Sequence, residues 1–174
     1  DQAEKIDRLT INGSRIMLLE MPFRMWRQKD IDQVRNLIEE RKFSLIIAHL
    51  ERFMKTAGNK EYIEELMSLP VTIQINAESL SDWKQSHTLI KMFKRGQAHI
   101  LGSDCHGIHH RPPNLMEGRQ ILEKKAGEAC IRRLDEYGMD LLQQIFSDLQ
   151  NPLFSSNGQI ADISLYLQSR IGYA

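Results

Sequence analysis

Short runs of apolar residues alternate along the chain with longer stretches in which apolar residues recur every three or four positions. Continuous apolar runs are typical of buried strands, whereas the longer spacing is typical of helices that pack one face against a core. The runs predict strands at Arg15–Met21, Ser44–Leu50, Val71–Asn76 and Ala98–Ser103. The spaced stretches predict helices at Asp30–Lys42, Asn59–Leu69, Glu78–Arg95, Pro113–Lys125 and Glu128–Tyr137.

This alternation indicates βαβ units with right-handed crossovers, and therefore an α/β protein with a parallel sheet. Four predicted strands are few for a closed barrel, which usually needs about eight. Either the sheet is open, or strands that belong before the first residue are missing. The opening residues resemble the middle of a helix and include no initiator methionine, so we expect the chain to be a fragment.

Local signals mark helix ends and a change in character near the end of the chain. Asp30 is a candidate N-cap, and Gly96 is a stop signal after the long helix. From residue 151 onward a polar loop precedes one more amphipathic stretch, Ile160–Ile171. We therefore expect one domain over residues 1–150 and a divergent helical tail over residues 151–174.

Composition narrows the class of protein. The 174 residues, 41% apolar and 26% charged, are those of one ordinary globular domain. The formal net charge of +0 indicates no general surface for binding polyanions, so we expect no nucleic-acid partner. No apolar run is long enough to cross a bilayer, and the two cysteines form no spacing motif. We expect a cytoplasmic protein without membrane insertion.

Three of the predicted strands end near a side chain that can bind a metal. Glu20 lies near the end of the first, His49 near the end of the second, and Asp104 follows the fourth, with His106 two residues later. Residues two apart on extended backbone point to the same side, so Asp104 and His106 can converge. Taken alone, a D-x-H pair is as typical of a surface turn or a helix cap as it is of a metal site. The other two strand ends favour a metal site, because parallel α/β folds bind ligands at this edge.

Two arginines lie near the predicted site: Arg52 shortly after His49, and Arg111 in the loop after the fourth strand. A guanidinium group matches a phosphate bidentately. Mixed carboxylate and imidazole ligands suit manganese, iron or zinc, which lower the pKa of a bound water. Together these groups describe a phosphoester hydrolase. For either arginine alone, a surface salt bridge with Glu51 or Glu117 is the simpler interpretation.

The segments IIAHLERF, INAESL and LGSDCHGIHHRPP resemble signatures of the polymerase and histidinol phosphatase (PHP) type of metal-dependent phosphatases. With LLEMPF, they are most similar to the bacterial protein-tyrosine phosphatases of capsular and exopolysaccharide loci. The resemblance implies a distorted (β/α)7 barrel with up to three metal ions, commonly manganese, and a substrate phosphotyrosine in the tail of a bacterial tyrosine kinase. It implies metal binding by Glu20, His49, Asp104 and His106, and phosphate contacts by Arg52 and Arg111.

The family begins with a D-x-H-x-H strand that supplies two further histidines, and nothing before Ile11 plays that part here. We therefore expect the chain to lack part of the metal cluster and at least one barrel strand. Two alternatives stay open: a small-molecule phosphatase related to the histidinol-phosphate enzymes, and a degenerate domain that binds a partner through Met21–Trp26. That apolar stretch is equally suited to a lid or a barrel rim, and it allows an oligomer without arguing for one.

Overall fold

The structure is a computed structural model that describes residues 9–105 and 114–150. A four-stranded sheet with the strand order β1-β2-β3-β4 lies at its centre. The strands are β1 (Ile16–Leu19), β2 (Ser44–Ile47), β3 (Thr72–Asn76) and β4 (Ile100–Gly102). Every neighbouring pair is parallel, so the predicted parallel α/β architecture is confirmed.

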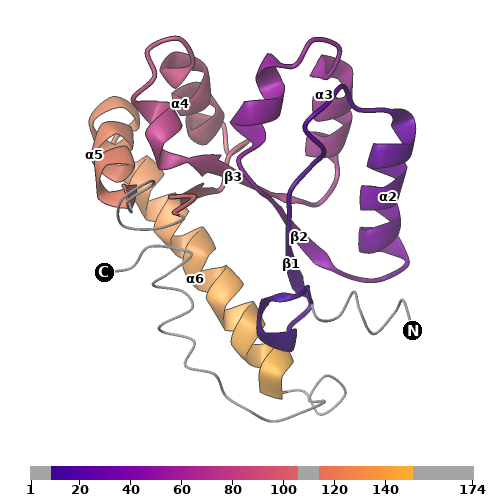
Figure 1. Ribbon diagram of the computed structural model, residues 1–174. Helices are drawn as coiled ribbons and strands as arrows, with labels where there is room; N and C mark the ends of the chain where they lie inside the picture. Colours follow the sequence, from indigo (N-terminus) through magenta and orange to yellow (C-terminus); the bar gives the residue numbers. More distant parts are fainter. Residues whose placement is uncertain (1–8, 106–113, 151–174) are drawn as a thin grey trace.

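A helix lies in each connection between neighbouring strands, as the alternation predicts. The α-helices are α2 (Gln28–Glu39), α3 (Lys60–Ser68), α4 (Ser86–Lys94), α5 (Leu115–Ala126) and α6 (Glu128–Gln150). The short 3-10 helices are η1 (Ile11–Gly13), η2 (Leu50–Lys55) and η3 (Ala77–Leu80). Figure 1 shows α2 and α3 beside one end of the sheet and α4 and α5 beside the other, while the long α6 runs from α5 toward η1.

The two faces of the sheet are covered by different elements. Met17 and Ile73 face the larger core, which also contains buried apolar residues of α2 to α5 and, from the start of α6, Cys130 and Ile131. Ile16 and Ile46 point to the other face and pack with Ile145 of α6. Because successive strand residues point to opposite faces, β2 is buried on both sides, whereas β1 is so only at Ile16 and Met17, since Leu18 is 42% exposed. Helix α6 therefore serves as the cover of the second face.

Hydrogen bonds also join α6 to the starts of β1 and β2. The backbone N–H of Arg15 donates to the carboxylate of Asp148 at 2.9 Å. The side-chain amide of Gln144 donates to the hydroxyl of Ser44 at 3.0 Å. These contacts join residues 133 and 100 positions apart. The last described helix therefore fixes the first strand in place.

The prediction that Asp30 caps its helix is wrong by three residues. Helix α2 begins at Gln28, and Asp30 lies in its first turn. The Asp30 carboxylate instead accepts a hydrogen bond from the backbone N–H of Arg27 at 2.8 Å. It thus satisfies a backbone donor at the helix start from the third helical position rather than from the cap.

The single helix predicted over Glu78–Arg95 is also wrong, because the structure divides it into η3 and α4. The carboxylate of Asp82 accepts a hydrogen bond from the backbone N–H of Lys84 at 3.0 Å. Such local side-chain bonds favour a turn over a continuous helix. The predicted stop at Gly96 is confirmed: it follows α4 with a φ of 68°, a conformation that glycine adopts without strain.

Two further predictions concern parts of the chain beyond this description. The tail over residues 151–174 lies outside the described residues, and closure of the sheet into a barrel stays a prediction. Within residues 9–105 and 114–150, no helix combines the length and the apolar character that a membrane span requires.

Candidate functional site

Four of the predicted site residues lie at the C-terminal edge of the sheet: Glu20, His49, Arg52 and Asp104. Glu20 directly follows β1, His49 comes two residues after β2, and Asp104 comes two residues after β4. The backbone N–H of Ala48 donates to the carbonyl of Leu19 at 2.9 Å, which keeps the ends of β1 and β2 in register. Parallel pairing thus brings residues that are far apart in sequence to one edge.

Glu20 and His49 are in direct contact. The imidazole Nε2 of His49 lies 2.9 Å from Oε1 of Glu20. The histidine is buried, whereas 51% of the glutamate side chain remains exposed. The second ring nitrogen of His49, Nδ1, is buried and has no hydrogen-bond partner among the described residues. The pair therefore presents a carboxylate to solvent above a buried imidazole.

The surroundings of His49 favour its neutral form. Burial lowers the pKa of the imidazole, and the nearby Arg52 guanidinium lowers it further. The carboxylates of Glu20 and Asp104 act in the opposite direction but do not reverse the shift. Neutral imidazole is the form that binds metals.

Arg52 and Asp104 form an ion pair across the site. The side chain of Arg52 is 29% exposed and that of Asp104 is 16% exposed, so the pair lies near the surface without being fully solvated. From the sequence, the alternative for an arginine near the site was a surface salt bridge with Glu51 or Glu117. In the structure, Arg52 pairs with Asp104 instead. Arg52 therefore lies beside a predicted metal ligand, Asp104, and its contact with phosphate stays a prediction.

The donor set of the site fits a divalent metal. Imidazole nitrogen and carboxylate oxygen are ligands that manganese, iron and zinc accept, and the Nε2 of His49 and the Oε1 of Glu20 lie 2.9 Å apart. Asp104 brings a second carboxylate to the same edge. In the described ranges, however, no three His, Cys, Asp or Glu side chains already converge as a ligand group. His106 and Arg111 lie outside those ranges, so the four-ligand cluster and the second phosphate contact stay predictions.

From the sequence, Glu51 was considered only as a possible salt-bridge partner for an arginine, but its contacts in the structure are different. Its carboxylate is almost fully buried and accepts hydrogen bonds from the hydroxyl of Ser79 at 3.0 Å and the backbone N–H of Asn76 at 3.4 Å. Burial raises the pKa of Glu51 above its ordinary value. The carboxylate thereby links η2, which carries Arg52, to the end of β3. The signal in the sequence that could have indicated a role for Glu51 is its position between His49 and Arg52 in the H-x-E-R run.

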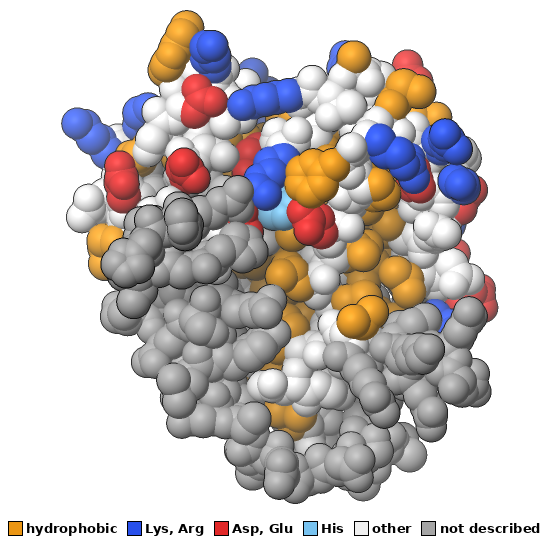
Figure 2. Space-filling view, in the orientation of Figure 1, with side chains coloured by type: hydrophobic (Ala, Val, Ile, Leu, Met, Phe, Trp, Pro, Cys, Tyr) orange, Lys and Arg blue, Asp and Glu red, His pale blue; other side chains and the backbone are white. Residues whose placement is uncertain are grey.

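Aromatic rings line the other side of His49. The ring of Phe23 lies 6.0 Å from the imidazole at an interplanar angle of 23°. It also contacts the buried ring of Phe53, with centroids 5.0 Å apart. Figure 2 shows a histidine side chain on this face of the molecule between basic, acidic and hydrophobic side chains. The site therefore combines charged groups with an apolar rim.

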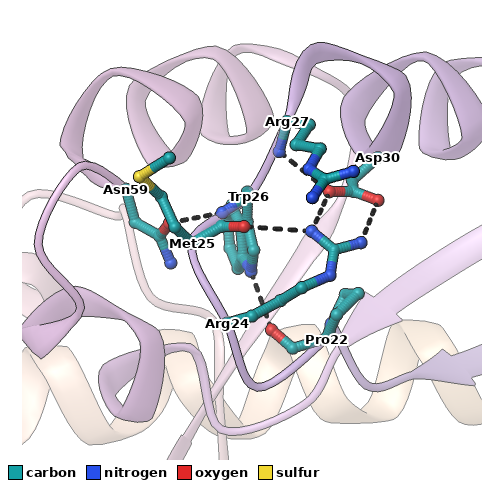
Figure 3. A network of polar contacts seen from close by, with 7 residues as sticks. All are labelled: Pro22, Arg24, Met25, Trp26, Arg27, Asp30 and Asn59. Atoms are coloured by element: carbon teal, nitrogen blue, oxygen red, sulfur yellow. Dashed lines mark hydrogen bonds and ion pairs between the residues drawn. The ribbon is translucent and has the colours of Figure 1, made fainter.

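Phe23 is carried by a loop that polar contacts hold in place (Figure 3). Both terminal nitrogens of Arg24 donate to the carboxylate of Asp30 at 2.7 Å. The backbone N–H of Trp26 donates to the side chain of Asn59 at 2.7 Å, and its indole N–H donates to the carbonyl of Pro22 at 3.1 Å. The loop is thus fixed to α2 and to the start of α3.

A parallel α/β sheet with carboxylate, imidazole and guanidinium groups at its C-terminal edge defines a class: α/β proteins with the elements of a metal-assisted hydrolytic site. Within this class, the chain belongs to the CpsB/CapC family of capsular polysaccharide synthesis, whose family model matches residues 1–142.

Two relatives from streptococci are similar over most of this chain. The tyrosine-protein phosphatase CpsB of Streptococcus pneumoniae is 27% identical over 142 residues, which cover 77% of this chain and 58% of the relative. The protein of the same name from Streptococcus agalactiae serotype III is 26% identical over 134 residues, covering 72% and 54%. The chain thus spans little more than half the length of these relatives.

The fold resembles that of crystal structures of YwqE from Bacillus subtilis and CpsB from Streptococcus pneumoniae, described as unique metal-dependent tyrosine phosphatases. The superposition has a TM-score of 0.68 at 22% sequence identity and covers 82% of this chain and 60% of the other. At this identity the likeness concerns the fold, and it agrees with the fold class that the PHP-type segments predicted.

Proposed function

We propose that the protein to which this chain belongs is a metal-dependent phosphomonoester hydrolase, most specifically a protein-tyrosine phosphatase. The observation that carries the proposal is the meeting of Glu20, His49, Arg52 and Asp104 at one sheet edge in a chain of the CpsB/CapC family. The streptococcal relatives are tyrosine-protein phosphatases by name, which supports the same reaction class.

The chain's own residues have distinct parts in the proposed reaction. Glu20, His49 and Asp104, with His106, would hold the metal, for which manganese is the first choice and iron or zinc are alternatives. When bound, such an ion supplies positive charge for the transferring phosphoryl group and lowers the pKa of a coordinated water. Neutral His49 keeps a lone pair available for ligation.

Arg52 would bind the phosphoryl oxygens. A guanidinium group carries five N–H donors, more than one carboxylate oxygen can accept. Its side chain is 29% exposed, so a ligand can reach it while Asp104 holds the other side. Arg111 would provide a second contact of this kind. Fixed donors that face the phosphoryl group stabilise the charge that develops during transfer.

The proposed substrate is phosphotyrosine in the C-terminal tail of a bacterial tyrosine kinase that controls capsule or exopolysaccharide synthesis, and the proposed compartment is the cytoplasm. The family description, capsular polysaccharide synthesis, supports this setting.

The test uses protein expressed from the full coding sequence, stripped with a chelator and reloaded with Mn²⁺, Fe²⁺ or Zn²⁺. We expect metal-dependent release of phosphate from a phosphotyrosine peptide, and little from a phosphoserine peptide of the same sequence. Preference for histidinol phosphate would favour a small-molecule phosphatase instead. Absence of hydrolysis of any of these esters with every metal would overturn the proposal and favour a non-catalytic domain.

A further inference from the structure

Phe23 places an aromatic ring at the surface directly beside the candidate site. The residue is 67% exposed, although phenylalanine is commonly buried. Its ring lies next to His49, with centroids 6.0 Å apart, and is supported by the buried Phe53 at 5.0 Å. The ring is therefore held against two others while much of its surface stays open to solvent.

The loop that carries Phe23 is fixed before any ligand arrives. The bidentate contact of Arg24 with Asp30 holds one side of it, and the fully buried Trp26 anchors the other. A group held in its binding position loses little conformational freedom on binding. The exposed ring is therefore suited to contact a ligand at low entropic cost.

We infer that Phe23 is a specificity-determining residue that packs against the aromatic ring of an aryl phosphate. The inference rests on the proposed function, in which the substrate is already an aryl phosphate, and adds to it the residue that favours aryl over alkyl esters. In an aryl phosphate a single oxygen separates phosphorus from the ring, so a phosphoryl group between Arg52 and the Glu20–His49 pair brings that ring close to Phe23. Aromatic rings pair favourably at centroid distances of about 4.5–7 Å, offset or edge to face.

Two substitutions separate this role from simple cover for His49, one at Phe23 and one at Met25. Leucine at position 23 would keep apolar cover over the imidazole but would remove the aromatic face. Met25 offers a matched control, because it is 58% exposed on the same loop. Its sulfur lies against Gly58, at 2.7 Å from where a Cβ on that glycine would stand. Met25 is therefore an exposed apolar residue of the loop with a different neighbour.

The experiment compares the metal-loaded full-length wild type with Phe23→Leu, Phe23→Trp and Met25→Leu. The substrates are phenyl phosphate and ethyl phosphate, and the binding probes are phenylphosphonate and methylphosphonate. For Phe23→Leu we expect kcat/KM for phenyl phosphate, and affinity for phenylphosphonate, to fall about three- to tenfold. The values for both alkyl compounds should change less than about twofold. Phe23→Trp should retain the aryl preference, and Met25→Leu should leave it unchanged.

Each outcome bears on a different claim. Equal losses for aryl and alkyl compounds in Phe23→Leu would assign the ring to support of His49 and overturn the inference, as would an unchanged aryl preference. If the wild type hydrolyses neither ester, the proposed function fails, and phosphonate binding still decides the role of Phe23. Tighter binding of phenylphosphonate than of methylphosphonate that depends on Phe23 would then support aryl recognition, and equal binding would overturn it.

Discussion

At the scale of single residues, His49 and Asp104 share an unusual backbone conformation. Both have positive φ, 36° and 49°, and neither is glycine. This left-handed region costs most L-residues about 1–2 kcal/mol, although asparagine, aspartate and histidine enter it more readily than other residues. The turns at the ends of β2 and β4 therefore restrict which residues can occupy the site.

This restriction yields a prediction for Asp104. Asp104→Asn should keep the backbone conformation but lose the negative charge that favours metal binding. Asp104→Ala should lose both, and should unfold with about 1 kcal/mol less free energy than the asparagine variant. We expect metal content and phosphatase activity to fall sharply in both variants. Denaturant unfolding and elemental analysis on the same samples test this, and wild-type turnover by either variant would refute the role.

Arg52 carries the second prediction at this scale. Arg52→Lys keeps the charge but loses the planar fork of donors. We expect kcat/KM to fall roughly ten- to a thousandfold, because a charge-assisted contact in a shielded site contributes about 1.5–4 kcal/mol. Metal content should stay unchanged. Arg35→Lys is the control, since Arg35 pairs with Glu65 at 3.0 Å on a surface of α2 and α3. Near-normal kinetics of Arg52→Lys would leave the phosphate contact without support.

The sequence allowed prediction that Glu20, His49 and Asp104 lie at one edge of the sheet, but not of how the side chains there pair. Glu20, His49 and Asp104 follow strands, and parallel pairing places all strand ends at one edge. The pairing of Arg52 with Asp104 depends on how the turns after β2 and β4 are oriented, and no local pattern encodes that. The buried position of Glu51 was missed for the same reason, because a carboxylate in a 3-10 helix looks like a solvated residue until its partners on β3 and η3 are known.

At the scale of elements, the loop between β1 and α2 depends on one buried carboxylate. The Arg24 guanidinium, together with the backbone N–H of Arg27, lowers the pKa of Asp30 from 3.8 to about 2. A carboxyl group with a lowered pKa stabilises the fold fully above its unfolded pKa. That contribution is lost as pH falls from about 4 through about 2.

We therefore expect Asp30→Asn to lower the free energy of unfolding by about 1–2 kcal/mol at pH 7. The difference from the wild type should shrink as pH falls below 4. Denaturant unfolding at pH 7, 5, 4 and 3 measures it. Asp32→Asn, a change of an exposed residue on the same helix, should have a small effect at every pH. A constant difference across the series would mean that the charge of Asp30 is not what stabilises the loop.

Element types were predictable from the sequence, whereas several element boundaries were not. Apolar spacing identified α2 correctly, but the cap was assigned to Asp30 because aspartate is a common N-cap residue. The helix predicted over Glu128–Tyr137 is too short; a glycine, Gly138, follows directly, and glycine costs a helix about 1 kcal/mol relative to alanine. The helix instead continues to Gln150, because packing of its apolar residues against the sheet offsets that cost.

At the scale of the whole molecule, the second face of the sheet depends on α6. Ile145 is 2% exposed and packs with Ile16 and Ile46. Ile145→Ala should lower the free energy of unfolding by about 2–4 kcal/mol, because it removes buried methyl groups and leaves a cavity. Phe146→Ala, a change of an aromatic residue on the same helix that is 47% exposed, should cost less than about 1 kcal/mol. Equal effects of the two substitutions in thermal or denaturant unfolding would contradict this assignment of the core.

The dependence of β1 on α6 also sets an order of events during synthesis. Arg15 leaves the ribosome before its partner Asp148, which follows 133 residues later. At about 5–20 residues per second, this gap lasts roughly 7 to 27 seconds. During that time, Ile16 and Ile46 lie on a sheet face that has not yet received its cover. A nascent chain that pauses before α6 should therefore expose an apolar strand surface, the kind of surface that chaperones bind and that aggregates form from.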